Sequence, residues 1–270
     1  MAWLRKKENH HRRWSQPVDL PFALLGEGKR RYLYGMFSSL APRYDALNNL
    51  FSFRQHARWR SAAVEMGKLQ PHYCVLDLAC GTGDMLLECA TRLDTSGQVI
   101  GVDFSESMLA LAEDKAARAA VACRCSFVQG DMQALPIASG TIDVVTVAFG
   151  LRNAVQLEGA LSEIVRVLKP GGRLVVLEFN RPRKRLPRLL TGLYTNVVVP
   201  ILGRMLSGGT GYSYLPASVR MFPGRRKLAE LMHMAGLRGN VWRDLALGSV
   251  CIHTGSKPTQ EQHGRSRRNK

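Results

Sequence analysis

Long apolar runs are missing from this 270-residue chain: none approaches the roughly 20 residues that a membrane-spanning helix requires. Basic residues near the N-terminus have no apolar segment behind them, so we expect no secretory signal. The six cysteines form no Cys-x-x-Cys pair, and no histidine lies near Cys123 and Cys125. We therefore expect a cytoplasmic protein with reduced thiols and without a bound metal.

Acidic residues are also few, since 21 Asp and Glu stand against 38 Lys and Arg, for a formal net charge of +17. Most of this excess lies in three segments: residues 1–35 with +5, residues 181–188 with +5, and residues 256–270 with +4. Such segments attract nucleic acid and anionic lipid alike, or are solvated ends. Charge alone does not distinguish between these partners. An organelle transit peptide within residues 1–35 is a further alternative.

The most informative stretch is residues 75–84, where an apolar run ends in a glycine turn and a helix-compatible segment follows. Gly81 and Gly83 allow positive φ and leave no Cβ between backbone and ligand. Twenty residues after Gly83, a second apolar run ends in Asp103, at the spacing expected for a carboxylate that binds ribose hydroxyls. The pattern predicts a Rossmann-type nucleotide site.

The third glycine of a dinucleotide-binding turn is absent, because Leu86 occupies its position. Asp77 and Asp84 flank the turn and would repel a pyrophosphate. S-adenosylmethionine carries a sulfonium cation and an amino group and has no phosphate, so acidic neighbours suit it. The turn therefore favours S-adenosylmethionine as the cofactor over a dinucleotide or a purely structural glycine turn.

Alternating apolar runs and helical patterns predict an α/β fold with a parallel sheet covered on both faces. The predicted strands are residues 74–79, 98–103, 126–130, 142–149, 173–179, 240–246 and 249–254. The predicted helices are residues 106–120 (with Ser105 as N-cap), 156–168 and 226–235, after a helical region over 31–67 that breaks at Pro42. This order is that of the Rossmann-like, seven-stranded class I S-adenosylmethionine-dependent methyltransferase fold, with N-terminal helices and an insert after strand five.

The expected organisation is one methyltransferase domain between two basic ends. The parts are a flexible leader over 1–30, the domain over 31–256 with its insert at 180–222, and a tail over 257–270.

Ligands of such sheets bind at the carboxyl ends of the strands, which reduces the candidates to a short set. These are Gly81, Thr82 and Gly83 after strand one, Asp103 and Phe104 after strand two, Asp131 and Met132 after strand three, Ala148, Phe149, Arg152 and Asn153 after strand four, and Glu178 at strand five. Asp131 is placed to accept from an adenine amino group and Met132 to cover the ring. Core packing is the alternative for Met132, and a structural hydrogen bond is the alternative for Glu178.

The segment after strand four, residues 148–153, has no Asn/Asp-Pro-Pro-aromatic turn of the kind that base-modifying methyltransferases carry. It has instead small and apolar residues followed by Arg152, which suit an aromatic acceptor that becomes an anion. The basic runs also lack the interleaved aromatic residues on which single-strand binders stack bases. Nucleic acid is therefore not the expected partner, although a nucleic-acid-binding protein that retains a nucleotide site stays an alternative.

Many methyltransferases share the nucleotide turn, but three other segments are much more specific to a single family: residues 36–49, 149–153 and 212–223. With them the chain resembles, over residues 36–258, the C-methyltransferases of menaquinone and ubiquinone biosynthesis. The resemblance implies methyl transfer to a ring carbon of a polyprenylated quinol, demethylmenaquinol first and the ubiquinone-pathway benzoquinol second. It also implies cofactor contacts from Thr82, Asp103, Asp131, Met132 and Ala148, the last through its backbone only.

Under this hypothesis Arg152 stabilises the phenolate that activates the ring carbon, because a fixed cation placed where charge develops lowers the barrier and an unperturbed arginine is a poor base. Tyr44 and Asn153 orient the hydroxyls, and a water or Asp45 takes the proton. The structural alternatives are a core aromatic for Tyr44 and a helix cap for Asp45.

The polyprenyl tail needs an apolar channel and access to a bilayer. Residues 31–67 and 193–206 are the expected walls, and the basic residues 181–188 are expected to bind anionic headgroups at the inner face of the membrane. A homodimer is compatible with the chain. Alternatives are a methyltransferase for another phenol or a sterol, and a cofactor-binding scaffold in quinone synthesis.

Overall fold

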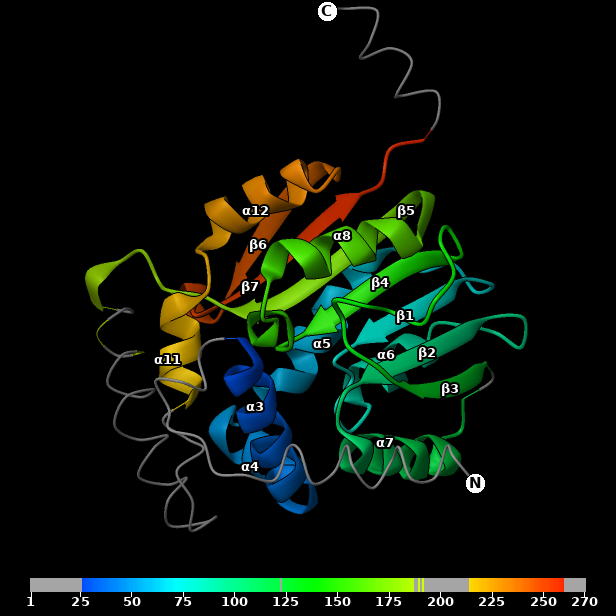
Figure 1. Ribbon diagram of the computed structural model, residues 1–270, viewed down its shortest axis with the longest axis horizontal. Coiled ribbons are helices and arrows are strands. Elements are labelled where there is room, and N and C mark those ends of the chain that lie inside the picture. Colours follow the sequence, from blue (N-terminus) through cyan, green and yellow to red (C-terminus); the bar gives the residue numbers. More distant parts are fainter. Residues whose placement is uncertain (1–25, 122, 187–188, 190, 192–213, 260–270) are drawn as a thin grey trace, which may run out of the picture.

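A seven-stranded mixed sheet forms the centre of the protein, in the order β3-β2-β1-β4-β5-β7-β6 (Figure 1). The computed structural model describes residues 26–121, 123–186, 189, 191 and 214–259. Of the seven strands, β7 alone runs in the opposite direction to the others. The strands are β1 (Cys74–Leu78), β2 (Gln98–Asp103), β3 (Arg124–Gln129), β4 (Ile142–Ala148), β5 (Leu168–Phe179), β6 (Arg238–Leu245) and β7 (Val250–Ser256). The predicted seven-stranded class I methyltransferase fold is confirmed.

Three strands begin earlier than the sequence predicts, and one of them is β6, which starts at Arg238 rather than at residue 240. β3 starts at Arg124 rather than at residue 126, and β5 starts at Leu168 rather than at residue 173. The turn expected over 169–172 is instead an irregularity within β5, because Leu168 already pairs with Ile142 of β4. The backbone N–H of Gly171 donates to Lys257 O at 2.8 Å, which ties this irregularity to the chain after β7.

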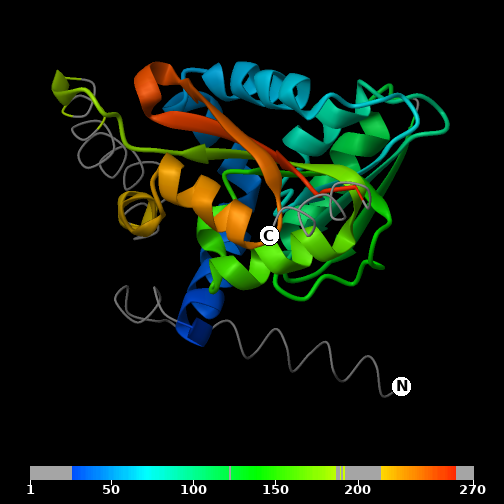
Figure 2. The same ribbon diagram turned by 90° about the horizontal axis from the view of Figure 1, so that it is seen from above.

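Helices cover both faces of the sheet, and each face has its own apolar core. Figure 2 shows α5 (Gln55–Gly67) on the opposite side of the sheet from α8 (Leu157–Val167) and α12 (Arg225–Met234). One core cluster joins Ile164 and Leu228 to the strands, and the other joins Val64 of α5 and Leu86 of α6 (Asp84–Ala90) to the strands. The sheet is therefore buried on both sides and rigidly positions the loops at its carboxyl edge.

α7 (Glu106–Arg118) begins after Ser105, which occupies the N-cap position without a capping hydrogen bond from its side chain. The Ser105 Oγ instead lies 3.0 Å from Ser107 Oγ, and its backbone N–H donates to Asp103 Oδ1 at 2.9 Å. The predicted N-cap residue is thus correct in position, and its side chain has a different partner.

The N-terminal helices lie over the carboxyl edge of the strands. They are α3 (Gly26–Leu40), the 3-10 turn η1 (Ala41–Arg43) and α4 (Tyr44–Phe51), so the expected break at Pro42 is confirmed and the first helix begins five residues before residue 31. Leu47 of α4 packs on Leu215 of α11 (Tyr214–Met221), which closes the edge from the side of the insert. The 3-10 turns η2 (Leu151–Asn153) and η5 (Ala246–Gly248) complete the described elements.

The apolar stretch 193–206, most of the expected insert and both basic ends fall outside the described residues, apart from 26–30 and 257–259. Within the described ranges, no helix is both long and apolar enough to span a bilayer.

Candidate active site

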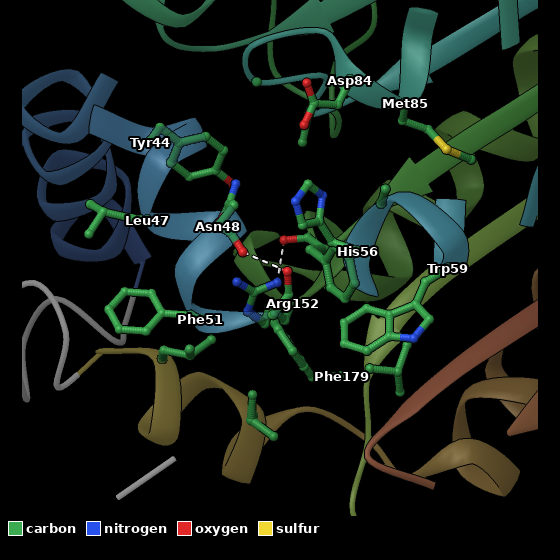
Figure 3. Close-up of a pocket in the computed structure, with 18 of the residues that line it drawn as sticks. Tyr44, Leu47, Asn48, Phe51, His56, Trp59, Asp84, Met85, Arg152 and Phe179 are labelled. Carbon is green, nitrogen blue, oxygen red and sulfur yellow. Dashed lines mark hydrogen bonds between the residues drawn. The ribbon is translucent and has the colours of Figure 1, made fainter. Parts of the chain in front are cut away.

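A cavity of about 380 Å³ opens at the carboxyl edge of β1 and β4, beneath α4, α5 and α11 (Figure 3). Cavities of this size hold small-molecule ligands. Its walls come from separate parts of the chain and include Tyr44, His56, Arg60, Asp77, Gly81, Thr82, Ala148, Arg152, Phe179 and Tyr214. The labelled side chains of Tyr44, His56 and Arg152 point into the same space in Figure 3. The edge that the sequence singled out is thus hollow.

The turn between β1 and α6 requires its glycines. Gly81 has φ +55° and Gly83 has φ +86°, in the left-handed region that other residues rarely adopt. A Cβ on Gly83 would lie 3.0 Å from the Cβ of Ala112 on α7, so the turn also depends on close packing. The N–H of Gly81 donates to Asp103 Oδ2 at 2.9 Å, which fixes the acidic end of β2 against the turn.

Two buried carboxylates lie beneath this turn. Asp77 is 0% exposed, and its Oδ1 accepts from the hydroxyl of Thr146 at 2.7 Å, while its Oδ2 has no partner among the described residues. Burial raises the pKa of Asp77 to about 7 and that of Asp103 to about 6. Both groups offer acceptor oxygens in a setting that favours a cationic or hydroxyl-bearing ligand.

The predicted cofactor residues fall into two groups. Gly81, Thr82 and Ala148 line the cavity, with Gly83 directly behind them in the same turn. The second group, beyond the cavity on the side of β2 and β3, consists of Asp103, Asp131 and Met132; Met132 packs against the apolar core.

α3 covers the second group. Arg30 forms an ion pair with Asp131. The centroid of the Phe104 ring lies 6.3 Å from that of Tyr34 and 6.1 Å from that of Phe37. α3 therefore borders both groups, because its Phe37 also lines the cavity, although the sequence did not assign this helix to the cofactor.

S-adenosylmethionine fits the residues present. Without Cβ atoms, Gly81 and Gly83 let a ligand approach the backbone. Asp103 lies at the end of β2 where ribose hydroxyls are expected, and the unpartnered Oδ2 of Asp77 is suited to an ammonium group. Among the described residues, no group of three or more His, Cys, Asp or Glu could hold a metal ion.

Arg152 lies in the turn η2 directly after β4 and is nearly buried, with a side chain 8% exposed. Its Nη1 donates to Glu178 Oε1 at 2.9 Å and to the carbonyl of Phe149, and its guanidinium carbon lies 5.3 Å from the Phe179 ring centroid. Glu178 also accepts from the backbone N–H of Arg152 at 3.3 Å. Glu178 therefore holds Arg152 in place, which is the structural alternative expected for this acid.

Tyr44 lies across the glycine turn, since a Cβ on Gly81 would be 3.9 Å from its Cε1. Burial raises the pKa of Tyr44, so its hydroxyl stays protonated at neutral pH. Asn153 is not a wall of the cavity; its Oδ1 accepts from Tyr214 OH at 3.2 Å, and Tyr214 is the wall. Asp45 makes no helix cap, because it accepts from Thr82 Oγ1 at 2.6 Å and pairs with Lys115 at 2.6 Å.

The sequence reasoning missed four cationic or titratable side chains at the site. His56, Arg60 and Lys115 surround Asp84, and Lys29 of α3 donates to the carbonyls of Arg152 and Ala154 in and after η2. His56 and Arg60 lie four residues apart on α5, so they share one face of this helix. That spacing was the available signal; Lys29 gave none, because its partners are more than 120 residues away in the chain.

The sheet order and the cofactor turn define the class I S-adenosylmethionine-dependent methyltransferase fold. A structure of an S-adenosylmethionine-dependent methyltransferase from Thermotoga maritima aligns with a TM-score of 0.60 at 20% identity, over 83% of this chain and 99% of that one. The sequence pattern of the ubiE/COQ5 methyltransferase family matches residues 26–257, and the chain belongs to this family.

Two curated relatives agree with this membership. The ubiquinone/menaquinone biosynthesis C-methyltransferase of Geobacter sulfurreducens is 43% identical over 87% of this chain and 91% of its own length. The demethylmenaquinone methyltransferase of Thermus thermophilus is 44% identical over 83% of this chain and 100% of its own length. The resemblance drawn from the sequence is confirmed.

Proposed function

We propose that this protein transfers the methyl group of S-adenosylmethionine to a ring carbon of a polyprenylated quinol, with demethylmenaquinol as the first candidate and the ubiquinone-pathway benzoquinol as the second. Family membership makes the chain a C-methyltransferase of menaquinone or ubiquinone biosynthesis. The observation that carries the choice of acceptor is Arg152, a buried cation at the wall of a cavity whose other walls are largely aromatic and aliphatic.

Bound S-adenosylmethionine supplies an electrophilic methyl group. We assign its binding to Gly81, Thr82, Gly83 and the backbone of Ala148 on the cavity side. On the α3 side we assign it to Asp103, Asp131 and Met132, which lie beyond the cavity. The acceptor then occupies the remaining part of the cavity, towards α4 and α11.

The acceptor carbon becomes nucleophilic when the neighbouring quinol hydroxyl loses its proton. Arg152 stabilises the resulting phenolate, because its charge is held in place by Glu178 in surroundings where water does not screen it. Tyr44 donates a hydrogen bond from its protonated hydroxyl and orients the acceptor. Asn153 acts through Tyr214, whose hydroxyl it fixes at the cavity wall.

In this proposal a water or Asp45 accepts the hydroxyl proton, and the methylated ring carbon then loses its own proton, which restores aromaticity. Asp45 is held by Thr82 and Lys115, beside the residues assigned to the cofactor. Proximity of the held acceptor and the methyl group supplies much of the remaining rate.

An anionic membrane surface is the proposed partner. A polyprenylated acceptor resides in the bilayer, and residues 181–185 present four basic side chains where the chain leaves β5 next to the cavity. Each basic residue near an anionic surface contributes about 1 kcal/mol to binding. We therefore propose that the enzyme acts as a peripheral protein at the inner face of the cytoplasmic membrane; the homodimer stays a prediction.

Replacement of Arg152 tests the catalytic assignment. Arg152→Met, combined with Glu178→Gln so that no buried carboxylate is left unpaired, should lower kcat on the quinol by about 10²- to 10³-fold, the range for loss of one preorganised charge-stabilising group. The Kd for S-adenosylmethionine, measured by calorimetry, should change less than about threefold.

Glu178→Gln alone is the control, since it keeps the cation and loses part of its support. Turnover of the Arg152→Met double variant at the rate of this control would contradict the role assigned to Arg152.

A further inference from the structure

A cluster of charged side chains closes the cavity on the side of α5 and α6. Arg60 is 8% exposed; its Nη1 lies 3.1 Å from Asp84 Oδ2 and also contacts His56 Nδ1. The other ring nitrogen of His56, Nε2, lies 3.0 Å from Asn49 Oδ1. With Nδ1 accepting from the guanidinium, Nε2 carries the proton and donates to the Asn49 amide oxygen. The ring therefore holds Arg60 in one orientation.

Asp84 is fully engaged within this cluster. Its Oδ1 accepts from Lys115 Nζ at 2.7 Å, and its Oδ2 pairs with Arg60. Burial alone would raise the pKa of Asp84, but the charges of Arg60 and Lys115 outweigh it and hold the pKa below its usual value. Lys115 also neutralises Asp45. Each carboxylate near Arg60 is thus already paired with a cation. These pairs leave part of the Arg60 guanidinium available for a further acceptor.

One edge of the Arg60 guanidinium is unused. The interactions with His56 and Asp84 both engage Nη1, whereas Nε is buried and has no hydrogen-bond partner among the residues the structure describes. A buried N–H without an acceptor is unfavourable, and guanidinium edges match the two oxygens of a carboxylate. The Nε of Arg60 therefore lacks an acceptor among the described residues, and Arg60 is a wall of the cofactor cavity.

The position of Arg60 relates it to one end of the cofactor. Asp103 and Asp131, assigned above to the adenosine end, lie on the β2 and β3 side of the glycine turn. Arg60 lies on the other side, where it pairs with Asp84, the first residue of α6 after that turn. The end of the cofactor that reaches α5 is then its methionine moiety, which carries a carboxylate.

We propose that Arg60 recognises the carboxylate of the cofactor's methionine moiety through its unused guanidinium edge, and that His56 and Asp84 position it for this task. The proposal rests on the cofactor placement above and is independent of the acceptor. Through this contact Arg60 distinguishes S-adenosylmethionine from adenosyl sulfonium compounds that lack the carboxylate. Arg60 is therefore a specificity-determining residue.

Calorimetric binding of two ligands tests the proposal. The ligands are S-adenosylmethionine and decarboxylated S-adenosylmethionine, which lacks only the carboxylate. The wild-type protein should bind the first about tenfold or more tightly than the second. Arg60→Met should lose about tenfold or more in affinity for S-adenosylmethionine and little for the decarboxylated compound, so that the preference disappears. Arg60→Lys should keep part of the preference, because it retains the charge without the planar fork.

Arg58→Met is the matched control, since Arg58 lies on the same helix and is exposed; it should leave both affinities unchanged. Equal losses for the two ligands in Arg60→Met would mean that Arg60 supports only the fold, and a retained preference would exclude the contact; either result overturns the proposal. If Arg60→Met does not fold, a wild-type protein without preference for the carboxylate overturns it as well. Failure to methylate a quinol would leave these results unaffected and would count against the proposed function alone.

Discussion

Asp77 is a single residue of the site that lowers the stability of the fold at neutral pH. Its carboxylate is fully buried in β1 with one hydrogen-bond donor, and burial raises its pKa to about 7. In the unfolded chain the pKa is near 3.9. The folded state therefore binds this proton more tightly, and the stability linked to it is complete below about pH 4 and is lost as the pH rises through about 7.

Asp77→Asn should remove this loss, because a neutral amide replaces the carboxylate. Its free energy of unfolding relative to wild type should increase by about 2–3 kcal/mol between pH 5 and pH 8, measured by urea denaturation. The affinity for S-adenosylmethionine should fall, since the acceptor suited to its ammonium group has become an amide. The exposed Asp114→Asn on α7 is the control. A difference between Asp77→Asn and wild type that does not vary with pH would contradict this account.

Much of the site was predictable at this scale, for a physical reason. Asp103 is the last residue of β2, and Arg152 lies in the turn after β4. Because the carboxyl ends of parallel strands meet at one edge of the sheet, local sequence was sufficient to place both residues. Arg60 and Lys29 act through contacts between distant segments, which no local pattern encodes. Asn153 was placed at the right turn, but the side chain that it contacts, Tyr214, comes from the insert.

α3 is the element that links the turn carrying Arg152 to the residues assigned to the adenosine end of the cofactor. Its Lys29 Nζ donates to the carbonyl oxygens of Arg152 at 3.0 Å and Ala154 at 2.6 Å, and the neighbouring Arg30 pairs with Asp131. Burial, and then the nearby charge of Arg152, lowers the pKa of Lys29 to about 8. One helix therefore holds the turn that carries Arg152 and covers the residues assigned to the adenosine end.

Lys29→Met should loosen η2, because the carbonyl of Arg152 within this turn and that of Ala154 directly after it lose their donor. We expect kcat on the quinol to fall about tenfold, since misplacement of a charge-stabilising group is sufficient for such a loss. The Kd for S-adenosylmethionine should change less than about threefold. Glu27→Gln, an exposed position on the same helix, serves as control. Unaltered steady-state kinetics in Lys29→Met would show that α3 does not position Arg152.

The elements themselves differ in how well the sequence encodes them. β2 and the closing hairpin of β6 and β7 were predicted from apolar runs and turn residues that need no distant partner. The early start of β5 could not be predicted, because it depends on pairing with β4 and on the bonds between 171–172 and Lys257. Boundaries are thus decided by tertiary partners, whereas the order of elements is decided locally.

On the scale of the whole molecule, the cavity is bordered by three segments without a single acidic residue: 46–60, 181–191 and 214–226. These segments also carry five of the large apolar side chains that are most exposed, namely Leu50, Phe53, Leu186, Leu189 and Met221. Figure 1 shows α4 and α11 on the same side of the molecule, away from β3. Positive charge and exposed apolar groups together suit an anionic bilayer.

Vesicle flotation should therefore detect binding to vesicles with anionic phospholipid and weaker binding to neutral ones. The double variant Leu50→Ser and Phe53→Ser should reduce the bound fraction by about threefold or more, because each side chain contributes apolar area. Met234→Ser is the matched control: Met234 is 75% exposed but lies at the C-terminal end of α12, outside these three segments. Equal binding to neutral and anionic vesicles, or equal loss in the control, would exclude this surface as the membrane contact.

The most direct test of the central claim is transfer of labelled methyl from S-adenosylmethionine to reduced acceptors in detergent, with demethylmenaquinol and the demethylated benzoquinol supplied separately. The account predicts a labelled C-methylated product from demethylmenaquinol, with the benzoquinol as the second acceptor, and loss of this product in the Arg152→Met, Glu178→Gln double variant. Tight binding of S-adenosylmethionine without transfer to either acceptor would contradict the account and would leave a methyltransferase for another phenolic or lipophilic acceptor, or a scaffold.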